Sequence, residues 1–204
     1  MSRCVIVGGA EIENYERLKQ ILLKDDYFIF CDSGLKHLKE LSVKPNLIVG
    51  DFDSFKQPET DIKIIKLPHE KDDTDTFAAV KTAIKNGFCD FLIIGVIGQR
   101  LDHTIANVSM LKYLKNKKAT AKIIDDYSEM FLLEKECEIS KEECEYFSVI
   151  ALSEKLEGLS IKGAKYELEN AVIENSFQLG VSNEPKSNTT ITLEKGDALI
   201  IKVF

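Results

Sequence analysis

The sequence lacks tryptophan and has only four prolines and three histidines among its 204 residues. It also lacks a run of about 20 apolar residues, which a membrane-spanning helix would need. Its first residues, MSRCVIVGGA, enter a strand-like segment without a signal-peptide pattern. We therefore expect neither a membrane protein nor a secreted one. A hydrophobic content of 44% predicts a globular protein with one large domain or two small ones. The scattered cysteines favour the cytoplasm as its location.

The five cysteines are scattered, and no CxxC motif occurs. Disulfide frameworks and zinc sites are therefore not expected, which agrees with a reducing compartment. Cys4, Cys31 and Cys89 lie in or beside apolar runs, and we predict that they are buried.

The net charge of −7 and the pI of about 5.1 argue against a nucleic-acid partner, since such proteins usually have a basic surface. The only dense basic segment, KYLKNKK at 112–118, is typical of the end of a helix, where cations stabilise the helix dipole.

Residues 1–126 alternate between strand and helix patterns, as a Rossmann-like parallel α/β domain does. Strands are predicted at 4–7, 27–31, 46–50, 62–67, 91–97 and 121–125. The helices between them are indicated by apolar residues at helical spacing: Tyr15, Leu18 and Leu22; Leu35, Leu38 and Leu41; Phe77, Val80 and Ile84; and Ile105, Val108 and Leu111.

Residues 127–204 have a different pattern. Short β-like runs are separated there by glycine, asparagine and proline, which predicts a small antiparallel β-sandwich. The segment EKGD at 194–197 is typical of a hairpin turn. We therefore expect an α/β protein with a second, all-β domain after Asp126.

Acidic residues collect where the predicted parallel strands end. Asp32 follows the second strand, Asp51 and Asp53 the third, Asp72, Asp73 and Asp75 the fourth, and Asp102 the fifth. Ligands of open parallel sheets bind at this edge. In an extended segment, residues i and i+2 point the same way, so we expect Asp51 and Asp53 to converge. Carboxylates this close repel one another, and a hard cation such as Mg²⁺ would compensate the repulsion.

The segment HEKDDTDTFAAV at 69–80 begins a helix near Thr74, whose amino end would favour an anion. Lys71 and Arg100 lie among the acids as candidate phosphate ligands. A single Asp at such a turn is more often only a helix cap, and His103 is more often a helix-start residue than a catalyst. His37 and His69 show no functional signal. Gly8-Gly9 does not fit the dinucleotide-binding motif, and no P-loop motif occurs.

Five motifs in order resemble the thiamine pyrophosphokinase family. They are GDFDS, KDDTD, GQRLDH, the pair GLSIKGAKYEL and GVSNE, and the closing GDALIIKV. The resemblance covers nearly the whole chain. It implies an ATP- and metal-binding catalytic domain, a C-terminal sandwich that binds thiamine and forms a homodimer, and Mg²⁺. The implied reaction transfers the diphosphate of ATP to the hydroxyl of thiamine, giving thiamine diphosphate and AMP.

The resemblance also implies roles for individual residues. Asp51, Asp53 and Asp75 would bind Mg²⁺, and Asp102 would complete the acidic catalytic set. Asp32, Lys71, Thr74 and Arg100 would contact ATP, and Tyr166, Ser182 and Asn183 would belong to the thiamine side. Ser33 and Gln99 stand where the family motifs have glycine, and Ala164 stands where they have leucine.

Two other functions remain open from the residues alone. A metal-dependent phosphoesterase could use the same acids to activate water. A non-catalytic thiamine or nucleotide sensor would keep the fold, although the intact Asp51, Asp53 and Asp75 argue against it.

Overall fold

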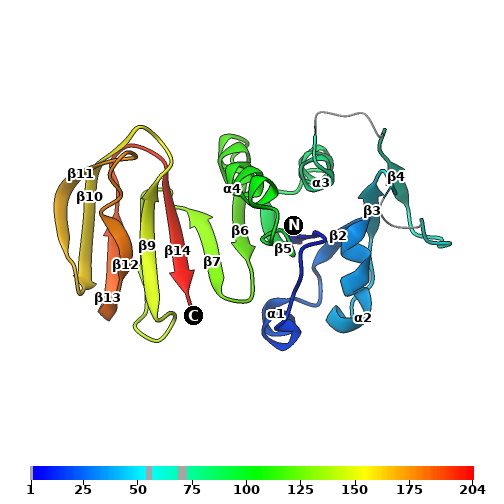
Figure 1. Cartoon of the computed structure of the whole chain (residues 1–204), viewed down its shortest axis with the longest axis horizontal. Helices are drawn as coiled ribbons and strands as arrows, with labels where there is room; N and C mark the ends of the chain where they lie inside the picture. Colours follow the sequence, from blue (N-terminus) through cyan, green and yellow to red (C-terminus); the bar gives the residue numbers. More distant parts are fainter. Residues whose placement is uncertain (1, 54–56, 69–72) are drawn as a thin grey trace. The chain divides into compact units, whose positions relative to one another are not determined.

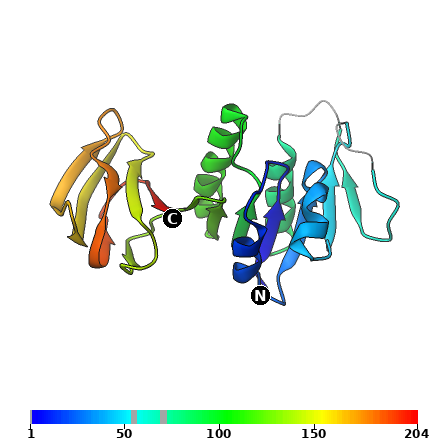
Figure 2. The same cartoon turned by 60° about the horizontal axis from the view of Figure 1, so that its bottom comes forward.

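The computed structural model describes residues 2–53, 57–68 and 73–204. The chain forms two compact units, Met1–Asp126 and Tyr127–Phe204, and each is described here by itself. In the colour scale of both views the first unit runs from blue to green and the second from yellow-green to red (Figure 1, Figure 2).

The first unit contains a parallel sheet with the strand order β6-β5-β1-β2-β3-β4. Its central strand pairs on both sides in register, with Cys4 opposite Tyr27 and Phe91. The strands are β1 (Cys4–Val7), β2 (Tyr27–Cys31), β3 (Leu47–Gly50), β4 (Ile64–Lys66), β5 (Asp90–Ile94) and β6 (Thr120–Ile124).

Helices cover both faces of this sheet, as its nearly continuous apolar strands require. The helices are α1 (Tyr15–Ile21), the 3-10 helix η1 (Ser33–His37), α2 (Leu38–Leu41), α3 (Asp75–Lys85) and α4 (Leu101–Asn116). Leu18 of α1 and Leu41 of α2 pack in one core cluster with alternate strand residues such as Val5 and Phe30, while α3 and α4 lie on the opposite side (Figure 1). The predicted parallel α/β architecture is confirmed.

The buried side of α4 differs from the predicted one. Asn107, Met110, Leu111 and Leu114 are buried, whereas Ile105 is 58% exposed. The spacing i, i+3, i+4, i+7 of the buried set is a complete helical stripe, which includes a polar residue that a hydrophobicity count passes over.

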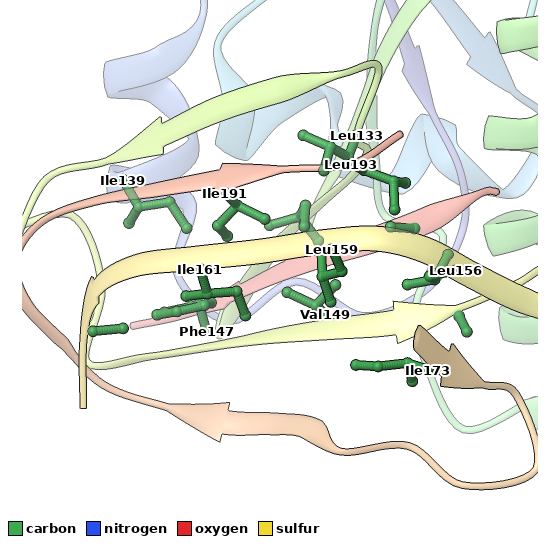
Figure 3. Close-up of a cluster of buried hydrophobic side chains, with 14 of the residues drawn as sticks. Leu133, Ile139, Phe147, Val149, Leu156, Leu159, Ile161, Ile173, Ile191 and Leu193 are labelled. Carbon is green, nitrogen blue, oxygen red and sulfur yellow. The ribbon is translucent and has the colours of Figure 1, made fainter. Parts of the chain in front are cut away.

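The second unit consists of two antiparallel sheets with the strand orders β12-β9-β14-β7 and β11-β10-β13-β8. Its strands are β7 (Ser128–Leu132), β8 (Glu136–Ile139), β9 (Tyr146–Ala151), β10 (Lys155–Ala164), β11 (Leu168–Glu174), β12 (Gly180–Asn183), β13 (Pro185–Thr192) and β14 (Ala198–Val203). Inward side chains from both sheets form one hydrophobic cluster, including Phe147, Val149, Leu159 and Ile161 (Figure 3). The predicted β-sandwich is confirmed.

The segment EKGD at 194–197 does not form the expected hairpin. The strand before it, β13, pairs with β10 and β8, and the strand after it, β14, pairs with β7 and β9. The segment therefore crosses from one sheet to the other. Reciprocal backbone hydrogen bonds between Glu157 and Lys195 hold it, and Gly196 adopts a φ of 110°. Alternating hydrophobicity identifies strands but does not select their partners.

Cys4 and Cys31 are buried as predicted, but Cys89 is exposed, because it lies in the connection just before β5 rather than in the strand. All five cysteines carry free thiols. Within the part of the chain that the structure describes, no helix has the length and apolar character needed to cross a membrane.

Candidate active site

A pocket of about 630 Å³ lies at the carboxyl ends of the strands of the first unit. Open α/β sheets bind their ligands at this edge because the loops after parallel strands meet there. Its lining comes from residues 9–11 after β1, Cys31 at the end of β2 and residues 32–33 after it, Asp51 and Asp53 after β3, residues 74–76 at the start of α3, Gly95, Val96, Gly98, Gln99 and Arg100 between β5 and α4, and His103 and Asn107 of α4.

Three carboxylates converge in this pocket. Asp32, Asp51 and Asp75 each place one oxygen within 4.8 Å of the other two. Asp32 follows β2, Asp51 follows β3, and Asp75 is the first residue of α3. Side chains separated by up to 43 positions in the sequence thus meet because the fold places these three segment ends together.

Convergence has an electrostatic cost. Two unit charges 4.8 Å apart repel by about 3.5 kcal/mol at an effective dielectric constant of about 20. Burial increases the cost, and Asp32 and Asp51 are only 3% and 9% exposed. Three hard oxygen donors at this separation fit a divalent cation such as Mg²⁺, which would offset the repulsion.

Asp53 lines the same pocket but does not belong to this group of three. The expectation that Asp51 and Asp53 point the same way required an extended segment. Phe52 between them instead has a left-handed φ of 59°, and the Asp53 N–H donates to the Asp51 Oδ1 at 3.2 Å. The chain therefore turns directly after Asp51, and Asp53 is exposed.

Two backbone N–H groups hold the carboxylate of Asp32. Its Oδ1 accepts a hydrogen bond from the Ser33 N–H, and its Oδ2 accepts one from the Phe52 N–H at 3.2 Å. A Cβ at Gly50 would lie 2.5 Å from the Asp32 Cβ, so the glycine of the GDFDS motif provides the space that Asp32 occupies.

The start of α3 is capped as predicted. The Thr74 Oγ1 accepts a hydrogen bond from the Phe77 N–H at 3.2 Å, and α3 ends before Asn86 and Gly87. Thr74 and Asp75 therefore bring the positive end of a helix dipole to the pocket. Lys71 and Asp72 lie outside the described residues. Asp73 forms an ion pair with Lys81 instead of lining the pocket.

Arg100 lines the pocket and is engaged by Asp102. Its Nε and Nη2 donate to the two carboxylate oxygens of Asp102 at 3.0 and 2.7 Å. Both side chains are well exposed, at 70% and 65%. The hydrogen bond from Arg100 lowers the pKa of Asp102 far below its usual range. Arg100 and His103 line the pocket, whereas Asp102 is not among the described residues that line it.

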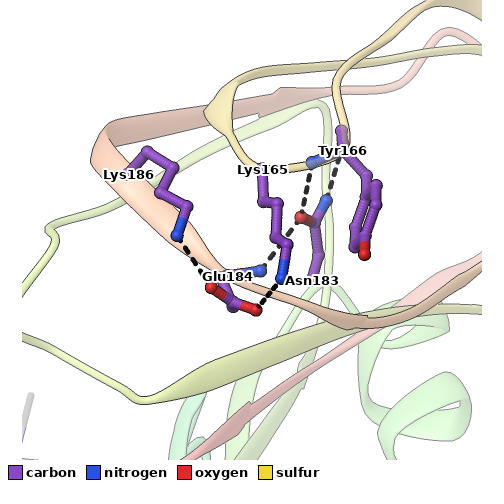
Figure 4. A network of polar contacts seen from close by, with 5 residues as sticks. All are labelled: Lys165, Tyr166, Asn183, Glu184 and Lys186. Carbon is purple, nitrogen blue, oxygen red and sulfur yellow. Dashed lines mark hydrogen bonds and ion pairs between the residues drawn. The ribbon is translucent and has the colours of Figure 1, made fainter.

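The residues expected on the thiamine side all lie in the second unit, and Tyr166 and Asn183 belong to one polar network (Figure 4). Asn183 is buried, and its amide pairs with the backbone of Tyr166, a residue that is 60% exposed. Ser182 has a left-handed φ of 55°, and its N–H donates to the Ser148 Oγ at 3.1 Å. The network also contains Glu184, which pairs with Lys165 and Lys186.

Sequence reasoning missed the wall formed by Gly9, Ala10 and Glu11, together with Cys31 and Asn107. The sequence contained one indication of this wall, because its residues follow the first predicted parallel strand, at the edge of the sheet where ligands bind. Cys31 and Asn107 had none, since an apolar-run cysteine and a mid-helix asparagine resemble ordinary core and surface residues.

Two family models match the two units. The model of the thiamin pyrophosphokinase catalytic domain matches residues 18–123, which include the three converging aspartates. The model of the thiamin pyrophosphokinase vitamin B1 binding domain matches residues 136–197, which include Tyr166 and Asn183.

Individual proteins of known sequence or structure are similar to the chain over nearly its whole length. The chain is 30% identical over 184 residues to thiamine pyrophosphokinase of Bacillus subtilis, covering 86% of each protein. The crystal structure of that bacterium's thiamine pyrophosphokinase superposes with a TM-score of 0.89 over 99% of both chains, at 26% identity. That of thiamin pyrophosphokinase from Geobacillus thermodenitrificans superposes with a TM-score of 0.85 over 98% of this chain and 97% of that one, also at 26% identity. By sequence and by fold, the chain belongs to the thiamine pyrophosphokinase family.

Proposed function

We propose that this chain is a thiamine diphosphokinase, which transfers the diphosphate of ATP to the hydroxyl of thiamine and releases AMP. The observation that carries the proposal is the convergence of Asp32, Asp51 and Asp75 in the unit that matches the family's catalytic domain. Family membership supplies the reaction, and this site supplies groups suited to it.

In this reaction the hydroxyl oxygen of thiamine bonds to the β-phosphorus of ATP. The bond from that phosphorus to the oxygen bridging to the α-phosphate breaks, and the hydroxyl proton passes to a carboxylate of the pocket. Diphosphoryl transfer depends mainly on positioning and on neutralising charge, and it needs no covalent nucleophile.

Mg²⁺ is the cation that we propose for Asp32, Asp51 and Asp75, with Asp53 beside them in the same pocket. A bound Mg²⁺ would neutralise charge on the phosphate oxygens. The chain's own contributions are the amino end of α3, which favours an anion, and Arg100, which can exchange Asp102 for a phosphate.

We propose that Tyr166 and Ser182 contribute to thiamine binding. The thiazolium ring of thiamine is cationic, and a cation over an aromatic face gains about 0.5–2 kcal/mol. The Lys165 Nζ lies 5.4 Å from the centroid of the Tyr166 ring, so the structure already holds a cation near this ring. Asn183 would act through Tyr166.

A homodimer is the proposed assembly. Phe177, Leu179 and Val181 are 67%, 58% and 51% exposed, next to and within β12, which is the last strand of its sheet in the second unit. Apolar side chains gathered beside a sheet edge favour a protein contact. The free thiols support the cytoplasm as the compartment.

The deciding experiment supplies ATP, Mg²⁺ and thiamine and identifies every product. The proposal predicts AMP and thiamine diphosphate in equal amounts, and no nucleotide turnover without thiamine. Formation of ADP would indicate transfer of a single phosphate. Release of inorganic phosphate without thiamine would identify the phosphoesterase instead.

A further inference from the structure

His37 is buried beside the pocket without lining it. It ends η1, its side chain contacts the loop after β1, and only 1% of the residue is exposed. Its Nε2 lies 2.8 Å from the Ala10 carbonyl oxygen, and its Nδ1 lies 2.7 Å from the Tyr15 hydroxyl. Both ring nitrogens therefore have a partner.

These partners define the protonation of the ring. A carbonyl oxygen only accepts, so the Nε2 carries a proton and donates to Ala10. Burial lowers the pKa of His37 and favours the neutral ring. In the neutral ring the Nδ1 accepts the hydrogen bond of the Tyr15 hydroxyl.

The loop that His37 holds is a wall of the pocket, formed by Gly9, Ala10 and Glu11. The residue before His37 contributes a second contact, because Lys36 forms an ion pair with Glu11. On its other side the loop is fixed by backbone hydrogen bonds, such as the one from the Ala10 N–H to the Gly95 carbonyl at 2.8 Å.

The 3-10 helix η1 and the loop after β1 are also packed closely against each other. A Cβ at Gly9 would lie 2.1 Å from the Ser33 Oγ, and a Cβ at Gly34 would lie 2.3 Å from the Val7 carbonyl oxygen. Ser33, which stands where the family motif has glycine, thus fills the space beside Gly9. The position of η1 therefore determines the position of the wall.

We propose that His37 is a positioning residue for the nucleotide: through its Nε2 it fixes the wall Gly9–Ala10–Glu11, and Tyr15 fixes the orientation of its ring. The inference rests on the proposed function only for the identity of the ligand. A nucleotide is expected at this wall because the loop after the first strand of an open α/β sheet lies where nucleotides bind.

The test measures the binding of a non-hydrolysable ATP analogue, with Mg²⁺, by titration calorimetry. His37→Asn keeps a polar side chain but is too short to reach Ala10, and we expect binding about tenfold weaker. His37→Gln extends an amide N–H to the position of the Nε2 and should bind within about threefold of the wild type. Tyr15→Phe should weaken binding about threefold, because the Nδ1 loses its donor.

Asn46→Ala is the matched control. It removes one hydrogen bond between a side chain and the backbone, from the Phe28 N–H at 2.7 Å, at the opposite end of the sheet. The analogue should bind this control as tightly as the wild type.

His37→Asn binding within twofold of the wild type would overturn the proposal, and so would an equal loss in Asn46→Ala. If His37→Asn does not fold, Tyr15→Phe decides, and unchanged binding in that variant overturns the proposal. A wild-type protein that binds no nucleotide also overturns it. The product analysis is a separate measurement, so binding that follows the predicted order without AMP formation would reject the proposed function and leave the role of His37 supported.

Discussion

The side-chain amide of Asn183 pairs with both backbone polar groups of Tyr166. The Tyr166 N–H donates to the Asn183 Oδ1 at 3.0 Å, and the Asn183 Nδ2 donates to the Tyr166 carbonyl at 2.7 Å. The same Oδ1 accepts the Glu184 N–H at 2.9 Å. Asn183 is 3% exposed, so the polar atoms of its side chain are committed to the backbone that presents the exposed Tyr166 ring.

Asn183→Asp should therefore affect both stability and thiamine binding. The change replaces the Nδ2 donor by a charged acceptor that faces the Tyr166 carbonyl, and we expect the free energy of unfolding to fall by about 1–3 kcal/mol. Urea unfolding measures this fall, and steady-state kinetics should show a higher KM for thiamine with the KM for ATP nearly unchanged.

Tyr166→Ala is the companion variant. Its side chain is largely exposed, so it should raise the KM for thiamine with a change in unfolding free energy below about 0.5 kcal/mol. A normal KM for thiamine in both variants would remove Tyr166 from the thiamine site.

Asp75→Asn tests the three converging carboxylates, because it keeps the shape of the residue and removes a charge. We expect kcat/KM to fall by about 10²-fold or more at saturating Mg²⁺. Without Mg²⁺ the free energy of unfolding should rise by about 1–2 kcal/mol, since one repelling charge is gone. Asp73→Asn, which affects an ion pair with Lys81 outside the pocket, is the control and should keep its activity. Near-normal turnover of Asp75→Asn would contradict the metal assignment.

Asp102→Asn separates two roles for Asp102. If Asp102 only holds Arg100, as its bidentate pairing indicates, the variant frees the guanidinium for phosphate. The KM for ATP should then fall by about threefold at low salt, with kcat within twofold of the wild type. A fall of kcat by tenfold or more would instead place Asp102 in the acidic catalytic set that the family resemblance implies.

Lys202 makes the stability of the second unit dependent on pH. Its Nζ lies 2.6 Å from the Glu129 Oε1 and 3.1 Å from the Glu143 Oε2, and its side chain is 10% exposed. Burial alone would lower the pKa of Lys202, but the two glutamates outweigh burial and raise it. Burial alone would raise the pKa of Glu143, but hydrogen bonds from the Ser140 N–H and from Lys202 outweigh burial and lower it.

The directions of these two pKa shifts determine the pH range over which the ion pairs stabilise the fold. The lowered pKa of Glu143 contributes stability above the usual glutamate pKa of about 4.3, and this is lost as the pH falls through the folded value. The raised pKa of Lys202 contributes stability below the usual lysine pKa of about 10.4, and this is lost as the pH rises through the folded value. The contribution of these groups should be constant between about pH 5.5 and 9.5.

Lys202→Met should lower the free energy of unfolding at pH 7 by about 3–5 kcal/mol, because Glu129 is left buried without its cation. The difference from the wild type should shrink as the pH falls below about 4.5, which urea unfolding over a pH series would show. Lys186→Met removes an exposed lysine from Glu184 and should change stability by less than about 1 kcal/mol at any pH. A difference that grows with acidity would contradict this account.

The sequence was sufficient for features that depend on neighbouring residues. Apolar periodicity located the strands of the first unit to within a few residues, and the cap at Thr74 followed from the chemistry of its side chain. The alternation of strands and helices implied a parallel sheet, and a parallel sheet places Asp32 and Asp51 at one edge. The family motifs added the reaction.

Other features depended on residues that are distant in the sequence. The left-handed backbone of Phe52 separates Asp53 from Asp51, while Asp32 completes the group of three. The segment after β13 crosses to the second sheet, and Ile105 faces solvent.

His37 is the clearest example of a feature that the sequence alone does not reveal. By itself it is an isolated histidine in a short helical segment, and the sequence shows nothing that separates it from a surface residue. Only the fold places its Nε2 against Ala10, 27 positions earlier, and its Nδ1 against Tyr15. Periodicity and capping are local properties of the chain and can be read from it, whereas the partners of a turn, a loop or a buried ring are selected by packing between distant segments, which the tertiary structure alone decides.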